Sequence, residues 1–323
     1  MFTHLYIEKK AAEYPVTKRV LQRSHIENVI YIDHYKDVFN RPGQDYGWQM
    51  RNGRSLILAV NDGNLIYEGA PLCQDFGFGD PCYSTSIMGC VFDCDYCFLK
   101  GMYKTGACVV FVNFDDYIKA VDDRLAKGPL YLSVSYESDL MSFDNLTGLS
   151  GLWEDLALTR PGLTIEIRTK AAPSEFKAAE NIIYAFTLSP DTVRERFEHG
   201  TASTDARIRS VNRALAQGAQ VRLCFDPLIY IKDAPGCYND FMDRIIRDID
   251  LTKVRDIGIG TFRIPSEYIR DLRKIRPESS AVNYPFENIN GVMRYPEEIE
   301  RMLLGIIKDK LEGKVGADRI YEI

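Results

Sequence analysis

Three closely spaced cysteines are the residues of this chain best suited to chemistry. Cys90, Cys94 and Cys97 form a C-x3-C-x2-C pattern inside the stretch from Gly89 to Phe98. Each thiolate can bind one iron of a [4Fe–4S] cube, a cluster that normally takes four cysteine ligands. Because no fourth cysteine lies close by, the pattern predicts a cube whose fourth iron is open to another ligand.

Two other interpretations of these cysteines remain. A structural zinc site would need a fourth Cys or His at a compact spacing. The next cysteine downstream, Cys108, lies beyond Gly101 and inside an apolar run. The thiols could also be buried residues without a metal. The spacing favours the cluster over both.

Composition places the chain among ordinary globular proteins. It has 323 residues, of which 46% are hydrophobic and 27% charged. No run approaches the roughly 18 apolar residues of a membrane span, and the N-terminus lacks the pattern of a signal peptide. Eight cysteines, three of them in an iron-type motif, fit a reducing compartment. We therefore expect a cytoplasmic monomer that does not associate with membranes.

The charge gives no general attraction to nucleic acid, because the formal net charge is −6. One basic run, from Arg270 to Arg276, could form a local basic face. Such a run is more typical of a solvated helix face. Charge alone therefore selects no partner.

Strand-like and helix-like segments alternate after residue 80, which predicts a parallel sheet with crossover helices. The expected strands are Tyr83–Met88, Leu130–Tyr136, Leu163–Thr169, Ile182–Leu188, Gln220–Phe225 and Asp256–Thr261. The expected helices are Asp115–Lys127, Leu149–Leu158, Asp191–Phe197, Asp205–Gln217, Asn239–Asp248 and Ser266–Lys274.

The first 80 residues form a separate pattern. An amphipathic stretch runs from Ala11 to Gln22, and a β-branched run follows at 29–32. Two apolar runs at 55–60 and 64–68 are joined by the turn residues Asn61-Asp62-Gly63, which predicts a hairpin.

Polar residues follow the expected strands, and in a parallel α/β fold the carboxyl ends of strands carry the active site. These residues are Tyr136 to Asp139, Arg168 to Lys170, Thr187 to Ser189, Asp226, and Thr261 to Arg263. A zwitterionic amino-acid group needs acceptors for its ammonium and a cation or donor for its carboxylate. Ser138, Asp139 and Lys170 can supply both.

The cysteine motif resembles that of the radical S-adenosylmethionine superfamily. Within it the chain is similar to spore photoproduct lyase and its relatives, which repair a methylene-bridged thymine dimer in DNA. The likeness is carried by five segments. They are the opening from Tyr6-Ile7-Glu8 to Tyr14-Pro15, the Gly89-Cys90 loop that closes in Phe98-Leu99-Lys100, Ser138-Asp139 with Asp144 to Thr147, Arg168-Thr169-Lys170, and the stretch from Arg196 to Ser203.

The resemblance implies a fold, cofactors and site residues. The fold would be a partial (β/α)6 TIM-type barrel at 81–265, with an N-terminal α/β extension at 1–80 and a C-terminal helical region at 266–323. S-adenosylmethionine would bind the open iron. Tyr96 would lie beside its adenine, and Ser138, Asp139, Lys170, Thr187 and Ser189 would line the rest of the cofactor. A donor such as flavodoxin or ferredoxin would reduce the cluster, and a 5′-deoxyadenosyl radical would abstract hydrogen from the substrate.

The chain departs from the lyases at two positions. The lyases carry a cysteine hydrogen donor where this chain has Tyr136, and commonly a tyrosine where it has Phe98. A product radical needs a hydrogen donor, for which Tyr136, Cys73 and Cys82 are candidates.

Three hypotheses follow. The chain could be a radical enzyme that acts on a thymine lesion or modified base in nucleic acid or a nucleoside. It could instead act on a small metabolite, amino acid or peptide, which the acidic charge and the missing cysteine favour. It could also be a non-catalytic cluster or zinc protein. Lys170 and Ser138 argue against the last, since a structural site needs no cradle for a zwitterion.

Overall fold

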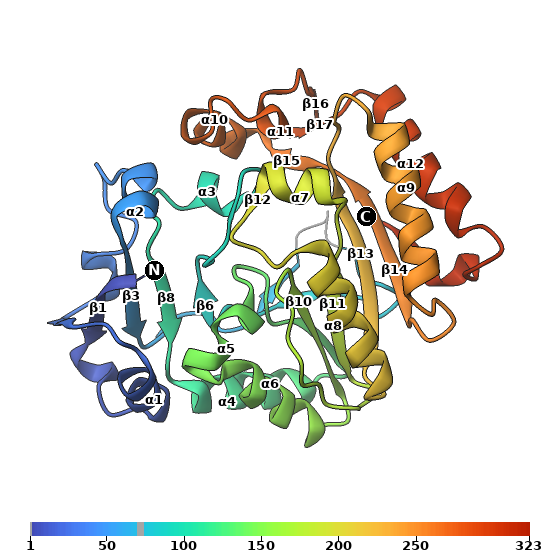
Figure 1. Ribbon diagram of the computed structural model, residues 1–323. Coiled ribbons are helices and arrows are strands. Elements are labelled where there is room, and N and C mark those ends of the chain that lie inside the picture. The colour runs from blue at the N-terminus through green and yellow to red at the C-terminus, as the bar shows by residue number, and fades with distance from the viewer. Residues whose placement is uncertain (1, 70–73) are drawn as a thin grey trace. The chain divides into compact units, whose positions relative to one another are not determined.

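Apolar runs form the strands of this protein, and amphipathic stretches between them form its helices (Figure 1). A computed structural model describes residues 2–69 and 74–323. The chain divides into two compact units. Unit 1 comprises the described residues of Met1–Gly69, Phe78–Val91 and Met102–Ile167, and unit 2 those of Ala70–Gly77, Phe92–Gly101 and Arg168–Ile323.

Unit 1 contains a five-stranded sheet in the order β2-β1-β3-β8-β6. The first four strands are parallel to their neighbours, and β6 is antiparallel to β8. The strands are β1 (Phe2–Glu8), β2 (Asn28–Ile32), β3 (Arg54–Ala59), β6 (Ile87–Met88) and β8 (Cys108–Phe111), and two helices, α1 (Pro15–Arg23) and α2 (Tyr46–Asn52), belong to the same part of the chain.

Four further strands begin in unit 1. They are β4 (Tyr67–Glu68), β5 (Cys82–Tyr83), β9 (Leu130–Ser133) and β10 (Leu163–Thr169). β4 is antiparallel to β5, whereas β5, β9 and β10 are parallel. The helices here are α4 (Phe114–Leu125), α5 (Leu140–Thr147) and α6 (Leu149–Leu158).

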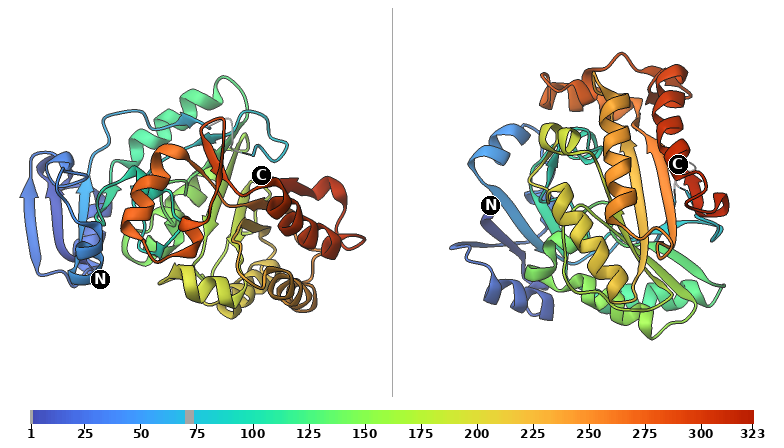
Figure 2. Two further views of the ribbon diagram at one scale, coloured as in Figure 1. Left: turned by 90° about the horizontal axis from the view of Figure 1, so that it is seen from above. Right: turned by 45° about the vertical axis from the view of Figure 1, so that its right-hand side comes forward.

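Unit 2 contains four parallel strands in the order β11-β13-β14-β18. Their bounds are β11 (Ile182–Thr187), β13 (Gln220–Leu228), β14 (Asp256–Thr261) and β18 (Ile320–Glu322). The helices α7 (Asp191–Phe197), α8 (Thr204–Ala216) and α9 (Ala234–Asp248) alternate with these strands along the chain, and α10 (Ser266–Ile275), α11 (Ser280–Asn283) and α12 (Glu297–Leu311) follow β14. α9 and α12 lie side by side, and α12 also packs on β14 (Figures 1 and 2).

Short elements complete unit 2. β7 (Asp93–Cys94) is antiparallel to β12 (Glu198–His199). β15 (Arg263–Pro265), β16 (Glu287–Ile289) and β17 (Val292–Arg294) form a small antiparallel sheet. α3 (Leu99–Met102) directly follows the cysteine motif. A Cβ on Gly101 would lie 2.4 Å from Tyr268 Cβ, so glycine is needed where this short helix meets α10.

Most expected elements after residue 100 are confirmed. The strands at 163–169 and 256–261 and the helices at 149–158 and 191–197 have the predicted bounds. Within the described residues, no helix is both long enough and apolar enough to cross a membrane.

Two expectations are wrong. The strand expected at 83–88 is split into β5 and β6, which lie in different sheets. Ser84 to Ser86 separate them, and these hydroxyl residues bond to other segments: Ser84 Oγ donates to the Leu65 carbonyl at 2.6 Å, and Trp153 Nε1 donates to Ser86 Oγ at 3.2 Å. The apolar runs around Asn61-Asp62-Gly63 do not form a hairpin either. β3 pairs with β1 and β8, because its fully buried Leu56 to Ala59 suit the interior of a parallel sheet.

Candidate active site

A buried carboxylate organises the part of the site that lies in unit 2. Glu198 is fully buried, and its Oε1 accepts hydrogen bonds from the Tyr96 hydroxyl and, at 2.9 Å, from Ser189 Oγ. Arg207 Nη2 donates to its Oε2 at 2.5 Å. Burial alone would raise the pKa of Glu198, but Arg207 and Lys170 outweigh it and hold the pKa below the usual range. Glu198 is therefore an anion with its hydrogen bonds satisfied.

Two predicted cofactor residues meet beside this carboxylate. Lys170 Nζ lies 5.4 Å from the centre of the Tyr96 ring, within range of a cation–π interaction. Burial lowers the pKa of Lys170, but Cys94 and Glu198 outweigh it, and the pKa is raised overall. Lys170 is thus a charged ammonium group. Thr187 also belongs to this group, because its carbonyl accepts a hydrogen bond from Arg207 Nη1 at 3.0 Å.

The second half of the cysteine motif is fixed to the same carboxylate residue. In the β7–β12 pair Cys94 lies opposite Glu198, and Cys97 N donates to the Cys94 carbonyl at 3.2 Å. Burial raises the pKa of Cys94 to about 12, with Lys170 acting in the opposite direction. Without metal, Cys94 is a neutral thiol at ordinary pH. Metal binding would deprotonate it.

Arginine and lysine side chains hold the acidic residues of the motif. Lys100 Nζ lies 2.7 Å from Asp93 Oδ1, and Arg276 pairs with Asp93 and, at 2.7 Å, with Asp95. The basic run at 270–276 is therefore only partly a solvated face, since its last residue anchors the motif.

Three further predicted ligand residues, Cys90, Ser138 and Asp139, lie in unit 1. Cys90 is half-buried. Ser138 Oγ is buried and has no hydrogen-bond partner among the described residues, which leaves a polar atom for a ligand to satisfy. Asp139 caps α5, because its Oδ1 accepts from Ser142 N at 3.0 Å. This cap occupies one of its carboxylate oxygens.

The candidate hydrogen donors Tyr136 and Cys82 differ in their surroundings. The Tyr136 ring stacks on Tyr83, with ring centres 4.4 Å apart. Cys82 is a buried free thiol, and burial raises its pKa. Cys73 lies outside the described residues.

Other strand-end residues serve structure. Asp226 is largely buried and pairs with Arg263 at 2.8 Å and Arg168 at 3.2 Å. Burial would raise the pKa of Asp226, but the two guanidinium groups lower it. Gly260 makes room for this pair, since a Cβ there would lie 2.8 Å from Asp226 Oδ1. Both guanidinium groups share this one carboxylate, so the three side chains together carry a net charge of +1.

Similarity to known proteins decides the family. The family model described as "Spore photoproduct lyase" matches residues 1–275. The spore photoproduct lyase of Bacillus subtilis (strain 168) is 23% identical over 241 residues, 71% of this chain and 68% of that protein. The spore photoproduct lyase of Geobacillus sp. (strain Y412MC61) is 20% identical over 264 residues, 78% of this chain and 75% of that protein.

The chain belongs to the spore photoproduct lyase family. It is therefore a radical S-adenosylmethionine enzyme, and its cofactors are a [4Fe–4S] cluster and S-adenosylmethionine. The interpretation as a non-catalytic protein is wrong. A solved spore photoproduct lyase mutant with bound AdoMet and dinucleoside spore photoproduct has a TM-score of 0.83 at 16% identity, covering 100% of this chain and 98% of that chain. This similarity confirms the predicted α/β, partial TIM-type barrel fold.

Within unit 2, the structure brings one part of the predicted site together. Tyr96, Lys170, Thr187 and Ser189 meet around Glu198 in unit 2. Cys90 belongs to a different compact unit from Cys94 and Cys97, and no group of three or more His, Cys, Asp or Glu side chains in 2–69 and 74–323 is close enough to hold a metal. The cysteine ligands therefore stay a prediction from the sequence motif.

Sequence reasoning missed the two residues that hold the unit 2 site together. Glu198 and Arg207 were not among the candidates, although Glu198 lies inside the distinctive stretch from Arg196 to Ser203. A charged residue within that motif was the available signal. Arg207 gives no sequence signal, because α8 contains several charged residues and nothing in the sequence distinguishes Arg207 from the others.

Proposed function

We propose that this enzyme acts on a thymine lesion or a related modified base in nucleic acid or a nucleoside. The family match over residues 1–275 carries the proposal. The solved relative with a bound dinucleoside spore photoproduct supports the same substrate class. When bound, the reduced cluster and S-adenosylmethionine would supply a radical that abstracts hydrogen from the substrate.

Cys90, Cys94 and Cys97 would hold the cluster. Their spacing supports this, and Cys94 and Cys97 are already fixed in the β7 region. Metal binding would offset the raised pKa of Cys94 by stabilising the thiolate.

The cofactor would be held by the residues named from the sequence. Lys170 would bind the methionine carboxylate, and the unpartnered Ser138 Oγ supports a hydrogen bond to the same end. Asp139, which also caps α5, would accept from the ammonium. Tyr96, oriented by Glu198, would lie beside the adenine, and Thr187 and Ser189 would line the pocket.

The three-part organisation also remains a proposal. Residues 1–80 would form an accessory region, 81–265 the barrel and 266–323 a C-terminal helical region. A flavodoxin or ferredoxin would supply the electron. The enzyme would work as a cytoplasmic monomer, a location that suits thiols kept for metal binding.

A small metabolite, amino acid or peptide is the second candidate substrate. Tyr136 favours it, because the lyases place a cysteine hydrogen donor at the matching position. Net charge −6 favours it as well.

Anaerobic reconstitution tests both candidates. Iron and sulfide content would first establish the cluster, and Cys90→Ala, Cys94→Ala and Cys97→Ala should each abolish it while Cys224→Ala should not. Dinucleoside spore photoproduct and single amino acids would then be added with reductant. The proposal predicts 5′-deoxyadenosine formation stimulated by the dinucleoside. Stoichiometric zinc without iron would contradict the cluster, and stimulation only by amino acids would contradict the substrate.

A further inference from the structure

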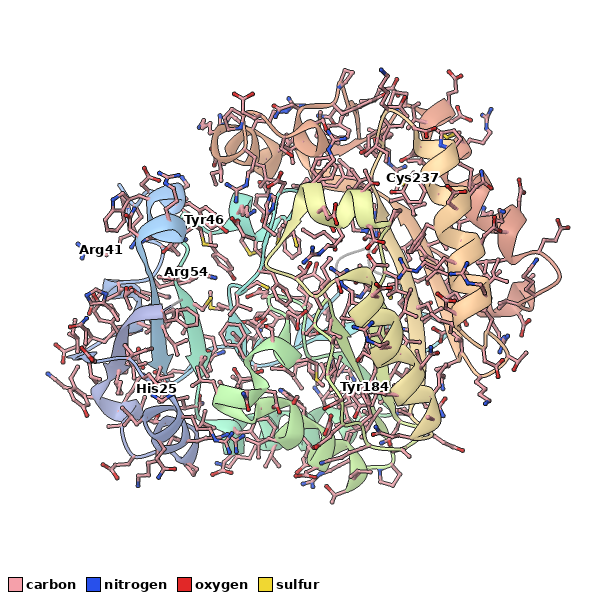
Figure 3. The ribbon with its side chains drawn as sticks, viewed as in Figure 1. His25, Arg41, Tyr46, Arg54, Tyr184 and Cys237 are labelled. Atoms are coloured by element: carbon pink, nitrogen blue, oxygen red, sulfur yellow. The ribbon has the colours of Figure 1, made fainter. Side chains whose placement is uncertain are left out.

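A buried arginine in unit 1 donates hydrogen bonds to the backbone of the first half of the cysteine motif. Arg54, the first residue of β3, is 5% exposed and lies on the N-terminal part of the chain (Figure 3). Its Nε donates to the Gly106 carbonyl at 2.6 Å, and its Nη1 donates to the Val91 carbonyl at 3.0 Å. Its Nη2 donates to the Cys90 carbonyl and, at 3.0 Å, to Cys108 Sγ.

These partners hold the backbone at Cys90 from several sides. Gly89 has φ of +84°, and a Cβ there would lie 2.8 Å from the Ala107 carbonyl and 3.2 Å from Cys108 Sγ. The segment that begins β8 is therefore packed directly against the entrance to the motif. Gln49 Oε1 accepts from Gly106 N at 2.6 Å, which fixes the other side of the Gly106 residue. Arg54 joins these pieces into one clamp.

The clamp lacks a negative charge. The partners of Arg54 in the described part of the chain are three backbone carbonyls and a cysteine sulfur, and its guanidinium also lies 5.5 Å from the centre of the Phe2 ring. None of these is a carboxylate. A buried charge without an opposite charge is costly, and arginine is a fixed cation. The position therefore calls for an anion near Cys90.

We infer that Arg54 is a positioning residue that orients Cys90 and supplies the positive charge that balances the thiolate-bound cluster. The inference rests on the proposed cluster at Cys90. Thiolate ligands make such a cluster anionic, and each electron added makes it more so. A fixed cation beside it stabilises the reduced form and raises its reduction potential.

The planar guanidinium suits this role better than an ammonium. Its N–H groups form a rigid fork, and here three of its nitrogens donate to four acceptors on two segments of the chain. Lysine would keep the charge but could satisfy fewer of these acceptors in fixed directions. The charge and the positioning can therefore be separated by substitution.

Arg54→Met, Arg54→Lys and the wild type would be reconstituted anaerobically and titrated by electron paramagnetic resonance. Arg54→Met should move the reduction potential to a more negative value, by about 59 mV for a tenfold change in the one-electron equilibrium. Arg54→Lys should keep a potential near that of the wild type, but a chelator should remove its iron about tenfold faster, as expected for one lost charge-assisted hydrogen bond.

Two variants serve as matched controls. Arg51→Met removes the same charge from an exposed position on α2, and Cys108→Ala removes only the sulfur partner of Arg54. Both should keep the wild-type potential. Circular dichroism would show whether each variant folds.

The outcomes separate this inference from the proposed function. A wild-type protein that binds no iron would contradict the cluster itself. A loaded wild type, with an Arg54→Met variant of equal iron content and unchanged potential, would overturn the role of Arg54. If Arg54→Met does not fold, Arg54→Lys decides: unchanged iron loss overturns the inference, and faster loss supports it.

Discussion

Two buried charges hold the two halves of the cysteine motif, and they differ in how they are neutralised. In unit 2, Glu198 is paired with Arg207 and accepts from Tyr96 and Ser189. In unit 1, Arg54 donates to the Cys90 and Val91 carbonyls of the other half, and its further hydrogen bonds go to the Gly106 carbonyl and to Cys108 Sγ outside the motif. Among the residues that the structure describes, Glu198 therefore has a cationic partner, whereas Arg54 has no carboxylate partner.

This difference predicts that the two charges act in different states of the protein. Glu198 is paired with Arg207 and orients Tyr96 and Ser189 before any cofactor binds, so it contributes to the stability of the cofactor-free protein. The charge of Arg54 is expected to act mainly once an anion is present. Substitutions at the two positions should therefore differ in the state of the protein in which their effects appear.

The largest effect on the cofactor-free protein is expected from Glu198→Gln. The change keeps the shape of the side chain but leaves Arg207, which is 0% exposed, without its carboxylate. Breaking a buried ion pair in this way should lower the free energy of unfolding by about 3–5 kcal/mol. Denaturant unfolding at neutral pH measures it.

Asp256→Asn provides the matched control. Arg222 and Asp256 form a second buried pair in unit 2, so the loss of stability should be similar. S-adenosylmethionine binding should suffer only in Glu198→Gln, because only Glu198 orients Tyr96. Equal cofactor affinity in the two variants would contradict the orienting role.

A smaller effect is expected from Lys170→Ala. Loss of one charge-assisted bond, worth about 1.5–3 kcal/mol, should weaken binding of S-adenosylmethionine roughly 10- to 150-fold. Titration of the reconstituted protein measures the affinity. Lys177→Ala removes a lysine a few residues further along the chain and should bind normally. Unchanged affinity in Lys170→Ala would rule out a contact with the methionine end.

The Asp226 network predicts a pH effect on stability. Because Arg263 and Arg168 lower the pKa of Asp226 in the folded state, its contribution is fully present above the unfolded pKa of about 4. It is lost as the pH falls through the lower folded pKa. In cofactor-free protein, the wild type should therefore exceed Asp226→Asn in free energy of unfolding at neutral pH, and this difference should shrink below about pH 4. A gap that stays constant down to pH 2 would disprove the assignment.

The sequence predicted the elements and the residue types of the site better than their pairing. Apolar residues located β10, β14 and α6, because both strands are almost entirely buried and α6 buries residues at helical spacing. The break between β5 and β6 could not be seen, since it depends on where Ser84 and Ser86 find partners in distant segments.

Two buried arginines, Arg54 and Arg207, were missed for a related reason. Arg54 and Arg207 are chemically ordinary in the sequence, and only tertiary contacts show that they are buried. The cysteine motif could be recognised by its short spacing, and Lys170 by its position at the end of a predicted strand. Long-range neutralisation of charge leaves no such local pattern.

The smallest expected change concerns Tyr136, where the lyases carry a cysteine hydrogen donor. Because this chain lacks that thiol, we expect little clean repair of spore photoproduct by the wild type.

Tyr136→Cys should raise the yield of intact thymine if the pocket accepts the dinucleotide lesion, since the product radical would gain a nearby thiol hydrogen. Tyr136→Phe is the control, because it keeps the ring that stacks on Tyr83 but removes the hydroxyl. The ratio of repaired thymine to trapped side products is the measurement. No gain in Tyr136→Cys would favour a different substrate. Efficient repair by the wild type would instead mean that a residue of this chain already donates the hydrogen. Substituting Tyr136, Cys73 and Cys82 one at a time would identify it, because removing the donor should lower the ratio of repaired thymine to side products.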